Sequence, residues 1–198
     1  MSTIGFLTRP SITTEAQALF DEDVAEDGYV MNVSKLWAYN APLVTALFDL
    51  MGQAVSDHKL TFRQRGILVA ACASTLGDAY CSLAWGAKLA GASDPQTAAA
   101  VICGSDEGLA DDERALASWA RKVANDPNHT TIEDVDELRS AGFSDAQIFA
   151  ITAFVALRLA FSTVNDALGV GPDTELRASA PRAVVEAVRF GRAPEQSA

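Results

Sequence analysis

The feature that most constrains this sequence is its dense series of helix start and stop signals, with almost no segment that alternates like a strand. Thr61 and Gln64 form a capping-box pattern, in which each side chain bonds a free backbone N–H at the start of a helix. Gly77 then supplies a stop signal, and Asp78 directly after it is a typical N-cap. Residues 144–147, Ser-Asp-Ala-Gln, repeat the capping-box pattern ahead of a long apolar stretch. The sequence therefore predicts an all-α fold.

The helix at 61–76 is apolar on nearly every side, so we expect it at the centre of the molecule. One joint recurs: residues 90–96, Ala-Gly-Ala-Ser-Asp-Pro-Gln, resemble residues 141–147, Ala-Gly-Phe-Ser-Asp-Ala-Gln. Either common turn chemistry or a duplicated helical unit explains the repeat, and we predict that the two joints superpose. The expected helices lie at residues 42–54, 61–76, 78–90, 93–104, 111–124, 130–142, 144–169 and 181–190.

Length and charge narrow the class of protein. The 198 residues are 49% hydrophobic and 21% charged, as in an ordinary globular domain. Fifteen Lys+Arg against 26 Asp+Glu give a net charge of -11. This charge repels the phosphates of nucleic acids and anionic lipids, so we exclude nucleic acid as the main partner.

The cysteines and the apolar runs indicate the compartment. The chain has 3 cysteines, an odd number, which favours reduced thiols over structural disulfides. Its first ten residues lack the basic start and long apolar core of a secretory signal. The longest strongly apolar run, residues 67–73, is far shorter than the ~20 residues that span a bilayer. We expect a soluble cytoplasmic protein that makes no membrane contact.

Signals for metals and cofactors are weak. Phosphate-loop, dinucleotide-binding and EF-hand patterns are all missing from the sequence. The two histidines, His58 and His129, lie in polar connections without neighbours at ligand spacing. We expect solvated loop histidines, no metal site and no cofactor.

The stretch with the most chemical potential is residues 77–85, Gly-Asp-Ala-Tyr-Cys-Ser-Leu-Ala-Trp. With Asp78 as N-cap, Cys81 lies in the first helical turn, where free N–H groups and the helix dipole favour a thiolate. The Asp78 carboxylate opposes a second negative charge nearby, or accepts the thiol proton. A small inert core cysteine and a plain N-cap are the alternative interpretations.

Aromatic residues flank the same cysteine. Tyr80 and Trp85 either pack in the core or contact a substrate. Cys72 and Cys103 lie in apolar surroundings, so we expect both to be core residues.

Several segments resemble the AhpD-like family, which includes carboxymuconolactone decarboxylases. Three of them are similar to the family core, and three more are similar to its peroxidase-related branch. These segments are residues 60–65, 77–81 and 89–93, followed by 112–127, 141–145 and 165–170. The resemblance covers residues 33–170 and implies an all-α helical bundle with internally duplicated helical units, which assembles into homo-oligomers. The chain would then be a single domain, with residues 1–32 as an N-terminal extension and 171–198 as a C-terminal helix and tail.

The redox members of this family carry a glutamate, then a CxxC pair, then a histidine four residues after the second cysteine. The resemblance implies that the second cysteine attacks peroxide, the first resolves it as a disulfide, and Glu and His relay protons. On this sequence the four positions hold Gly66, Asp78, Cys81 and Trp85. Only the attacking thiol remains, so an intrachain dithiol cycle cannot run.

Three functions stay open on the sequence. The first is a one-cysteine alkylhydroperoxidase or thiol-dependent oxidoreductase, with Cys81 and Asp78 catalytic, Tyr80 and Trp85 binding a small-molecule substrate, and an external thiol as resolver. The second is a cofactor-free acid–base enzyme for a small carboxylated or lactone substrate, as in the decarboxylases. The third is a non-catalytic member of the fold that binds an apolar ligand or a partner protein.

Overall fold

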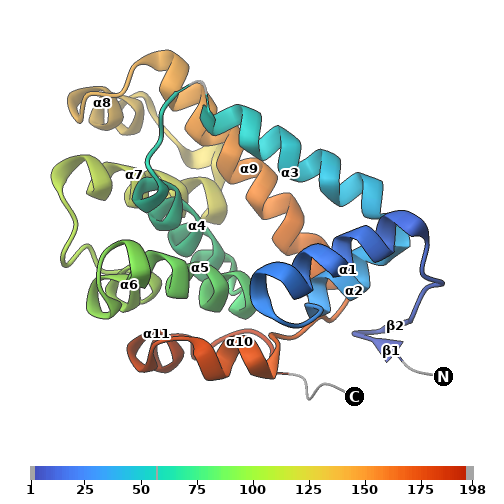
Figure 1. The fold of residues 1–198 in the computed structure, drawn as a ribbon. Coiled ribbons are helices and arrows are strands. Elements are labelled where there is room, and N and C mark those ends of the chain that lie inside the picture. Colours follow the sequence, from blue (N-terminus) through green and yellow to red (C-terminus); the bar gives the residue numbers. More distant parts are fainter. Residues whose placement is uncertain (1–2, 57, 195–198) are drawn as a thin grey trace.

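The protein is an all-α bundle, as the sequence predicts. The structure, a computed structural model, describes residues 3–56 and 58–194, and Figure 1 shows their arrangement. The N-terminal elements are β1 (Thr3–Ile4), β2 (Leu7–Thr8), α1 (Thr14–Asp27), α2 (Asn32–Trp37), the 3-10 helix η1 (Ala38–Asn40) and α3 (Ala41–Ser56). The central elements are α4 (Phe62–Leu76), α5 (Ala79–Ala92), α6 (Pro95–Ile102), α7 (Asp111–Asn125) and the 3-10 helix η2 (Pro127–His129). The remaining elements are α8 (Ile132–Ser140), α9 (Asp145–Ala167), α10 (Thr174–Ser179) and α11 (Arg182–Ala187).

Local capping chemistry sets the junction between α4 and α5. The Thr61 hydroxyl accepts a hydrogen bond from the backbone N–H of Gln64 (3.1 Å), and the Gln64 side chain accepts one from the Thr61 N–H (3.0 Å). Gly77 ends α4 with a φ of +83°, a left-handed conformation that glycine adopts without strain. Asp78 then caps α5, so the predicted junction is confirmed.

Removing the cap of α4 gives a measurable loss of stability. Replacing Thr61 with alanine deletes one half of the capping box, and we expect the free energy of unfolding to fall by about 1 kcal/mol. For a chain of this size, that loss lowers Tm by about 2–4 °C in a thermal melt. Thr163→Ala is the control, because this exposed hydroxyl donates to the Leu159 carbonyl within its own helix. Equal melting temperatures for the two variants would contradict the capping argument.

Helix α4 forms the centre of the core, with residues 66–73 all buried. It packs on α5, α7, α9 and α6. In Figure 1, α3 and α9 run side by side on one side of α4 and α5, and α10 and α11 lie below α5. Gly86 permits the close approach of α5 to its neighbours, because a Cβ there would lie 2.7 Å from both Ile102 and Val184.

Helix α9 is the one helix among residues 3–56 and 58–194 that is long and apolar enough, by length and composition, to cross a membrane. The sequence search for uninterrupted apolar runs passed over it, because Arg158 and Asn165 interrupt the stretch. In this fold α9 packs on α3, α4, α7 and α8 and buries both polar side chains. Helix α9 is therefore a core helix of this bundle.

The N-terminal segment contains elements that the sequence patterns did not predict. Helix α1 and the short β1–β2 hairpin lie there, and α2 begins at Asn32. Helix α1 has a sequence signal that was missed: the Thr13 hydroxyl accepts from the Ala16 N–H (3.2 Å), and Gly28 ends the helix with a φ of +84°. Its polar composition hid the apolar periodicity on which the helix assignments relied.

The prediction that the two repeated joints superpose is wrong. Gly91 lies inside α5 instead of ending it, and Asp94, not Ser93, caps α6. At the second joint Gly142 has a left-handed φ of +96° and Ser144 caps α9 with the predicted capping box. Pro95 explains the difference, since it favours the first helical position and moves the cap to the residue before it.

Two further boundaries differ from the prediction. Thr131, not Thr130, is the N-cap of α8, and its backbone N–H donates to Asp134 (3.0 Å). The helix expected at 181–190 is present as the shorter α11. Helix α10 was not predicted, and the extended backbone at Ala180 and Pro181 separates the two.

Candidate active site at the start of helix α5

The first turn of α5 positions the cysteine singled out in the sequence. Oδ1 of Asp78 accepts a hydrogen bond from the backbone N–H of Cys81 (2.9 Å), which fixes Cys81 in the first helical turn. Cys81 is 2% exposed and lines a cavity of about 280 Å³. The predicted position of the thiol in the first turn of a helix is confirmed, and the structure adds that it lies beside a cavity.

Burial opposes the thiolate that this helix position favours. Burial raises the pKa of the Cys81 thiol well above its ordinary value, and the nearby Asp78 carboxylate raises it further. The Arg158 guanidinium and a hydrogen bond with the Ser162 hydroxyl act in the opposite direction, but they do not outweigh burial. At neutral pH the resting side chain is therefore a thiol.

The central residue that sequence reasoning missed is Arg158. It lies on α9, is 4% exposed, and donates from Nη2 to the Cys81 Sγ (3.5 Å) and from Nη1 to the Met51 Sδ (3.8 Å). A lone arginine inside the apolar stretch at 148–161 was the available signal. Its pairing with a cysteine 77 residues earlier depends on the fold.

Two aromatic rings enclose the guanidinium. The Arg158 Cζ lies 5.3 Å from the ring centroid of Trp85 and 5.3 Å from that of Phe161, within the range of cation–π attraction. Phe161 in turn stacks on Trp37, with ring centroids 5.5 Å apart and 6° between the planes. Trp85, which stands at the family histidine position, thus covers the buried cation.

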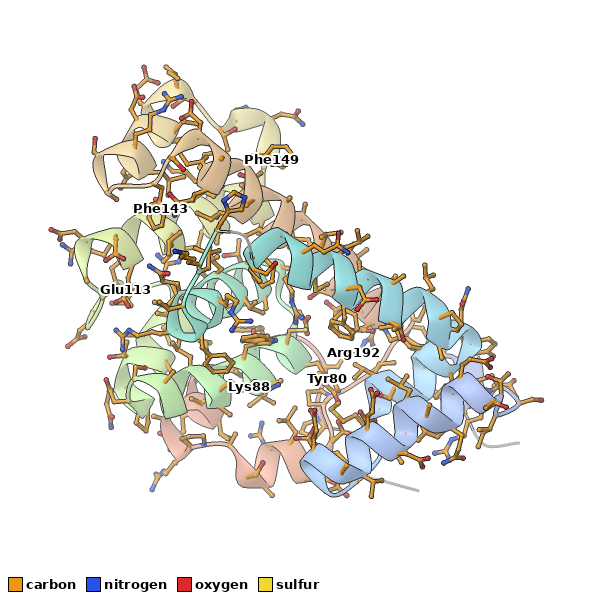
Figure 2. All side chains as sticks on the ribbon, turned by 45° about the horizontal axis from the view of Figure 1, so that its top comes forward. Tyr80, Lys88, Glu113, Phe143, Phe149 and Arg192 are labelled. Carbon is orange, nitrogen blue, oxygen red and sulfur yellow. The ribbon has the colours of Figure 1, made fainter. Side chains whose placement is uncertain are left out.

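The cavity lies between α1, α2, α3, α5 and α9. Figure 2 labels Tyr80 and Lys88, which lie on α5 on the side that faces α1. Three of the four predicted site residues, Tyr80, Cys81 and Trp85, line the cavity, and Asp78 lies behind them, fully buried. The other main lining residues are Leu19, Glu22, Asp23, Glu26, Met31, Val33, Ser34, Trp37, Val44, Phe48, Ala84, Arg158 and Phe161.

Tyr80 is held by a buried carboxylate. Its hydroxyl donates to Asp173, which also accepts from the backbone N–H of Asn32 (2.8 Å). Burial raises the pKa of Tyr80, and the negative charge of Asp173 raises it further. Tyr80 therefore ties α5 to the chain before α10 and α2 while one face of its ring meets the cavity.

Asp78 has a free oxygen in this arrangement. No group in the described part of the chain donates to its buried Oδ2 within hydrogen-bond distance. The negative charge of Asp78 also acts on Asp166 of α9. Burial is the main cause that raises the pKa of Asp166 to about 6, and the charge of Asp78 adds to it. The unpartnered oxygen makes Asp78 a candidate proton acceptor for the thiol.

The family glutamate position is filled by packing. A Cβ on Gly66 would lie 3.3 Å from the Leu89 Cβ and Cδ1, so a longer side chain there would require Leu89 to shift. The other two cysteines differ from each other. Cys72 is buried, as expected, and burial raises its pKa to about 12, whereas Cys103 is exposed, so its assignment to the core was wrong. Cys103 lies at the end of α6, where the chain leaves the bundle.

The histidines lie away from this cavity. His129 is exposed and pairs with Asp126 (Nδ1 to Oδ2, 2.6 Å), and His58 lies in the turn before α4. Among residues 3–56 and 58–194 no three side chains of His, Cys, Asp or Glu gather in a metal-binding group.

The raised thiol pKa predicts a pH dependence for alkylation. Because the thiolate is the reactive form, we expect Cys81 to react with iodoacetamide at pH 7 at least about tenfold more slowly than in the unfolded chain. The rate should keep rising above pH ~8.5, the ordinary thiol pKa. Peptide mapping by mass spectrometry measures this rate, with the exposed Cys103 as internal reference. Asp78→Asn keeps a cap oxygen but removes the charge, so it should accelerate alkylation. Fast labelling of Cys81 at neutral pH would contradict the assignment.

Comparisons with known proteins agree with the fold. No protein-family model matches the sequence, and no curated protein matches it. A solved structure described as an alkylhydroperoxidase AhpD core, an uncharacterized peroxidase-related protein from Ralstonia eutropha, is 22% identical with a TM-score of 0.79, covering 97% of this chain and 100% of that one. An uncharacterized peroxidase-related protein from Silicibacter sp. is 22% identical with a TM-score of 0.77, covering 88% and 95%.

A third match is the debrominase Bmp8. Its structure is 17% identical with a TM-score of 0.71, covering 89% of this chain and 92% of that one. A cysteine-to-alanine variant of Bmp8 in complex with 2,3,4-tribromopyrrole also matches, at 18% identity and a TM-score of 0.71. At these identities the matches establish the AhpD-like fold that the sequence resemblance implies.

Proposed function

We propose that this chain is a thiol-dependent oxidoreductase of the one-cysteine peroxidase type, in which Cys81 reacts with a small substrate bound in the cavity. The observation that carries the proposal is a lone thiol on the cavity wall, 3.5 Å from a buried guanidinium, with a carboxylate at the position of the resolving cysteine. Three neighbours in the fold are described as peroxidase-related or as a debrominase, and this supports redox chemistry on this fold.

In the first step the Cys81 proton moves to the free Oδ2 of Asp78. This transfer shifts one negative charge from the carboxylate to the sulfur, beside Arg158, and creates no additional buried charge. The thiolate then attacks the terminal oxygen of a hydroperoxide and the O–O bond breaks. The alcohol leaves with the proton, and the sulfur, oxidised by two electrons, becomes a sulfenic acid.

In the second step an external low-molecular-weight thiol resolves the sulfenic acid. Its sulfur bonds to the Cys81 sulfur and water leaves, and a second external thiol releases Cys81 and forms the reagent disulfide. Cys72 is on α4 with its own pKa raised by burial, and Cys103 is exposed at the end of α6, so neither is placed to serve as resolver. No metal or cofactor is needed for these steps.

Trapping the sulfenic acid tests this proposal. After one equivalent of cumene hydroperoxide, dimedone should label the Cys81 peptide, and the label should be missing from Cys81→Ser protein. Labelling confined to the exposed Cys103, or an unmodified Cys81 after excess peroxide, would reject the proposal.

A second candidate function is reductive dehalogenation of a small aromatic compound. It is favoured by the aromatic wall of the cavity and by the Bmp8 match, whose variant complex holds a brominated pyrrole. Here the thiolate would take the halogen as a sulfenyl halide while the ring carbon gains a proton, and an external thiol would release halide. Halide release from a bromophenol in the presence of thiol separates this function from peroxide reduction.

The other two sequence hypotheses make different forecasts for the same assays. A cofactor-free acid–base enzyme acting through Asp78 would retain its activity in Cys81→Ser, and a non-catalytic binding protein would show no turnover of either substrate.

We also propose that the protein is a cytoplasmic homo-oligomer. Its three cysteines are free, and α3 presents the exposed apolar side chains of Leu43 and Leu50. Light scattering at micromolar concentration should give a mass at least twice the 20.9 kDa of one chain. A monomer mass would reject the assembly and leave the site proposal intact.

A further inference from the structure

The candidate site contains a buried positive charge that forms no ion pair. Arg158 is 4% exposed, and no carboxylate in the described part of the chain forms an ion pair with it. Removing a guanidinium from water costs several kcal/mol, and proteins normally offset this cost with a paired anion. The lack of a partner is therefore a sign that something else supplies the negative charge.

The groups around Arg158 hold it without neutralising it. Two of its nitrogens donate to sulfur atoms, those of Cys81 and Met51, which are weak acceptors. Trp85 and Phe161 cover its faces, and Nε has no hydrogen-bond partner. Donors remain available on a guanidinium that already lines a cavity.

The walls of the cavity define the rest of the ligand. Most of the wall is formed by aromatic and aliphatic side chains, among them Trp37, Val44 and Phe48, and the buried Asp23 and Ser34 add polar groups. The volume of about 280 Å³ suits a single small ring or a short aliphatic chain, and is at the low end for drug-sized ligands. Such a cavity binds an apolar body and one polar group.

We propose that this cavity binds a small organic monoanion, a carboxylate or phenolate whose charge lies on Arg158 and whose apolar body lies on Trp37 and Phe48, next to the Cys81 sulfur. The inference deepens the proposed function, because it names the substrate class of the same site.

Charges around the cavity restrict the ligand to a single negative charge. Three carboxylates of α1 line the cavity, those of Glu22, Asp23 and Glu26, and the exposed Lys88 of α5 lines it as well. A second anionic group on the ligand would meet these carboxylates and find no second buried cation on the cavity wall. Ligands with two or more negative charges should therefore bind more weakly than monoanions.

Binding can be measured without the reactive thiol. In Cys81→Ser protein we would titrate benzoate and hexanoate, each against its neutral amide, and phthalate as the dianion, following the fluorescence of Trp37 and Trp85 and heat by calorimetry. We expect each monoanion to bind at least about tenfold more tightly than its amide, since a desolvated charge-assisted pair contributes on the order of 1.5–3 kcal/mol. Amides that bind as tightly as the acids, or no binding by any acid of the panel, would overturn the proposal.

Variants of Arg158 test the residue itself. Arg158→Gln should abolish the preference for benzoate over benzamide, whereas Arg158→Lys should keep part of it. Arg182→Gln, on the exposed face of α11, is the matched control and should bind benzoate as the parent does. An unchanged preference in Arg158→Gln would overturn the assignment. If Arg158→Gln fails to fold, the titrations of Cys81→Ser protein with acids and amides still test the proposal.

These outcomes are separable from those of the proposed function. Benzoate bound by Cys81→Ser protein supports the anion site even if Cys81 is never oxidised by peroxide. Sulfenic acid at Cys81 without any preference for acids supports the oxidoreductase and rejects the anion site.

Discussion

Replacing Cys81 with serine is expected to reduce thiol-dependent peroxide turnover by at least about a thousandfold, which corresponds to about 4 kcal/mol of lost transition-state stabilisation. A serine hydroxyl does not take oxygen from a peroxide, and among the described cysteines no other lines the cavity. Serine is close to cysteine in volume, so it should leave the packing of α5 nearly unchanged. The measurement is peroxide consumption in the presence of an excess of monothiol.

Cys103→Ser is the matched control, because this thiol is exposed and lies at the end of α6, away from the cavity. It should retain turnover close to that of the unchanged protein. A thermal melt of both variants separates loss of chemistry from loss of fold. Turnover that survives in Cys81→Ser, or disappears in Cys103→Ser, would show that the reactive thiol has been misplaced.

The second large effect is expected from Asp78→Cys, which should redirect the oxidised product from a sulfenic acid to an intrachain disulfide. Oδ1 of Asp78 already lies 2.9 Å from the backbone N of Cys81, so a thiol on residue 78 would be one helical turn from the attacking sulfur. The substitution also removes the carboxylate that raises the pKa of Cys81. Intact mass after one equivalent of peroxide should show the loss of two hydrogen atoms in place of an added oxygen.

Asp78→Ser is the control for this experiment, since it preserves an N-cap hydroxyl and removes the charge without adding a thiol. It should form the sulfenic acid more slowly than the unchanged protein, because the proton acceptor is lost, and it should form no intrachain disulfide. The replacement of the cap by cysteine should cost about 1 kcal/mol of stability, which a thermal melt will report. Persistence of the sulfenic acid in Asp78→Cys would mean that the two side chains diverge.

Restoring the glutamate at Gly66 and the histidine at Trp85 should raise activity less than the new cysteine does. A glutamate at Gly66 would displace Leu89 from the α4–α5 contact and bury a carboxylate. A histidine at Trp85 would remove one of the two rings that cover Arg158. A glutamate and a histidine at these positions would disturb the Gly66–Leu89 packing and the cover of Arg158.

The local parts of the site could be predicted from sequence. The Thr61 capping box, the stop at Gly77 and the cap at Asp78 depend on a few neighbouring residues, and together they place Cys81 in the first turn of α5. The prediction of a reactive thiolate used the same local terms, and it left out burial, which outweighs them.

The parts contributed by distant segments could not be predicted. Arg158 reaches Cys81 from α9 across 77 residues, and nothing in its neighbours specifies that contact. The predicted match between residues 90–96 and 141–147 is wrong for a related reason. Pro95 shifts the N-cap of α6 by one residue, although the neighbouring residue types still match those of the later joint. Single-sequence patterns describe turns well and tertiary neighbours poorly.

Helix α1 has a consequence for how proteins of this fold can diversify. It lies outside the segment that resembles the family, yet it supplies one wall of the cavity, including Leu19, Glu22 and Glu26. The thiol, the cap and the guanidinium all come from α5 and α9. The reactive centre and this wall of the cavity are thus encoded in separate stretches of the gene. Exchange of the first stretch by recombination would offer a new substrate to an unchanged reactive centre.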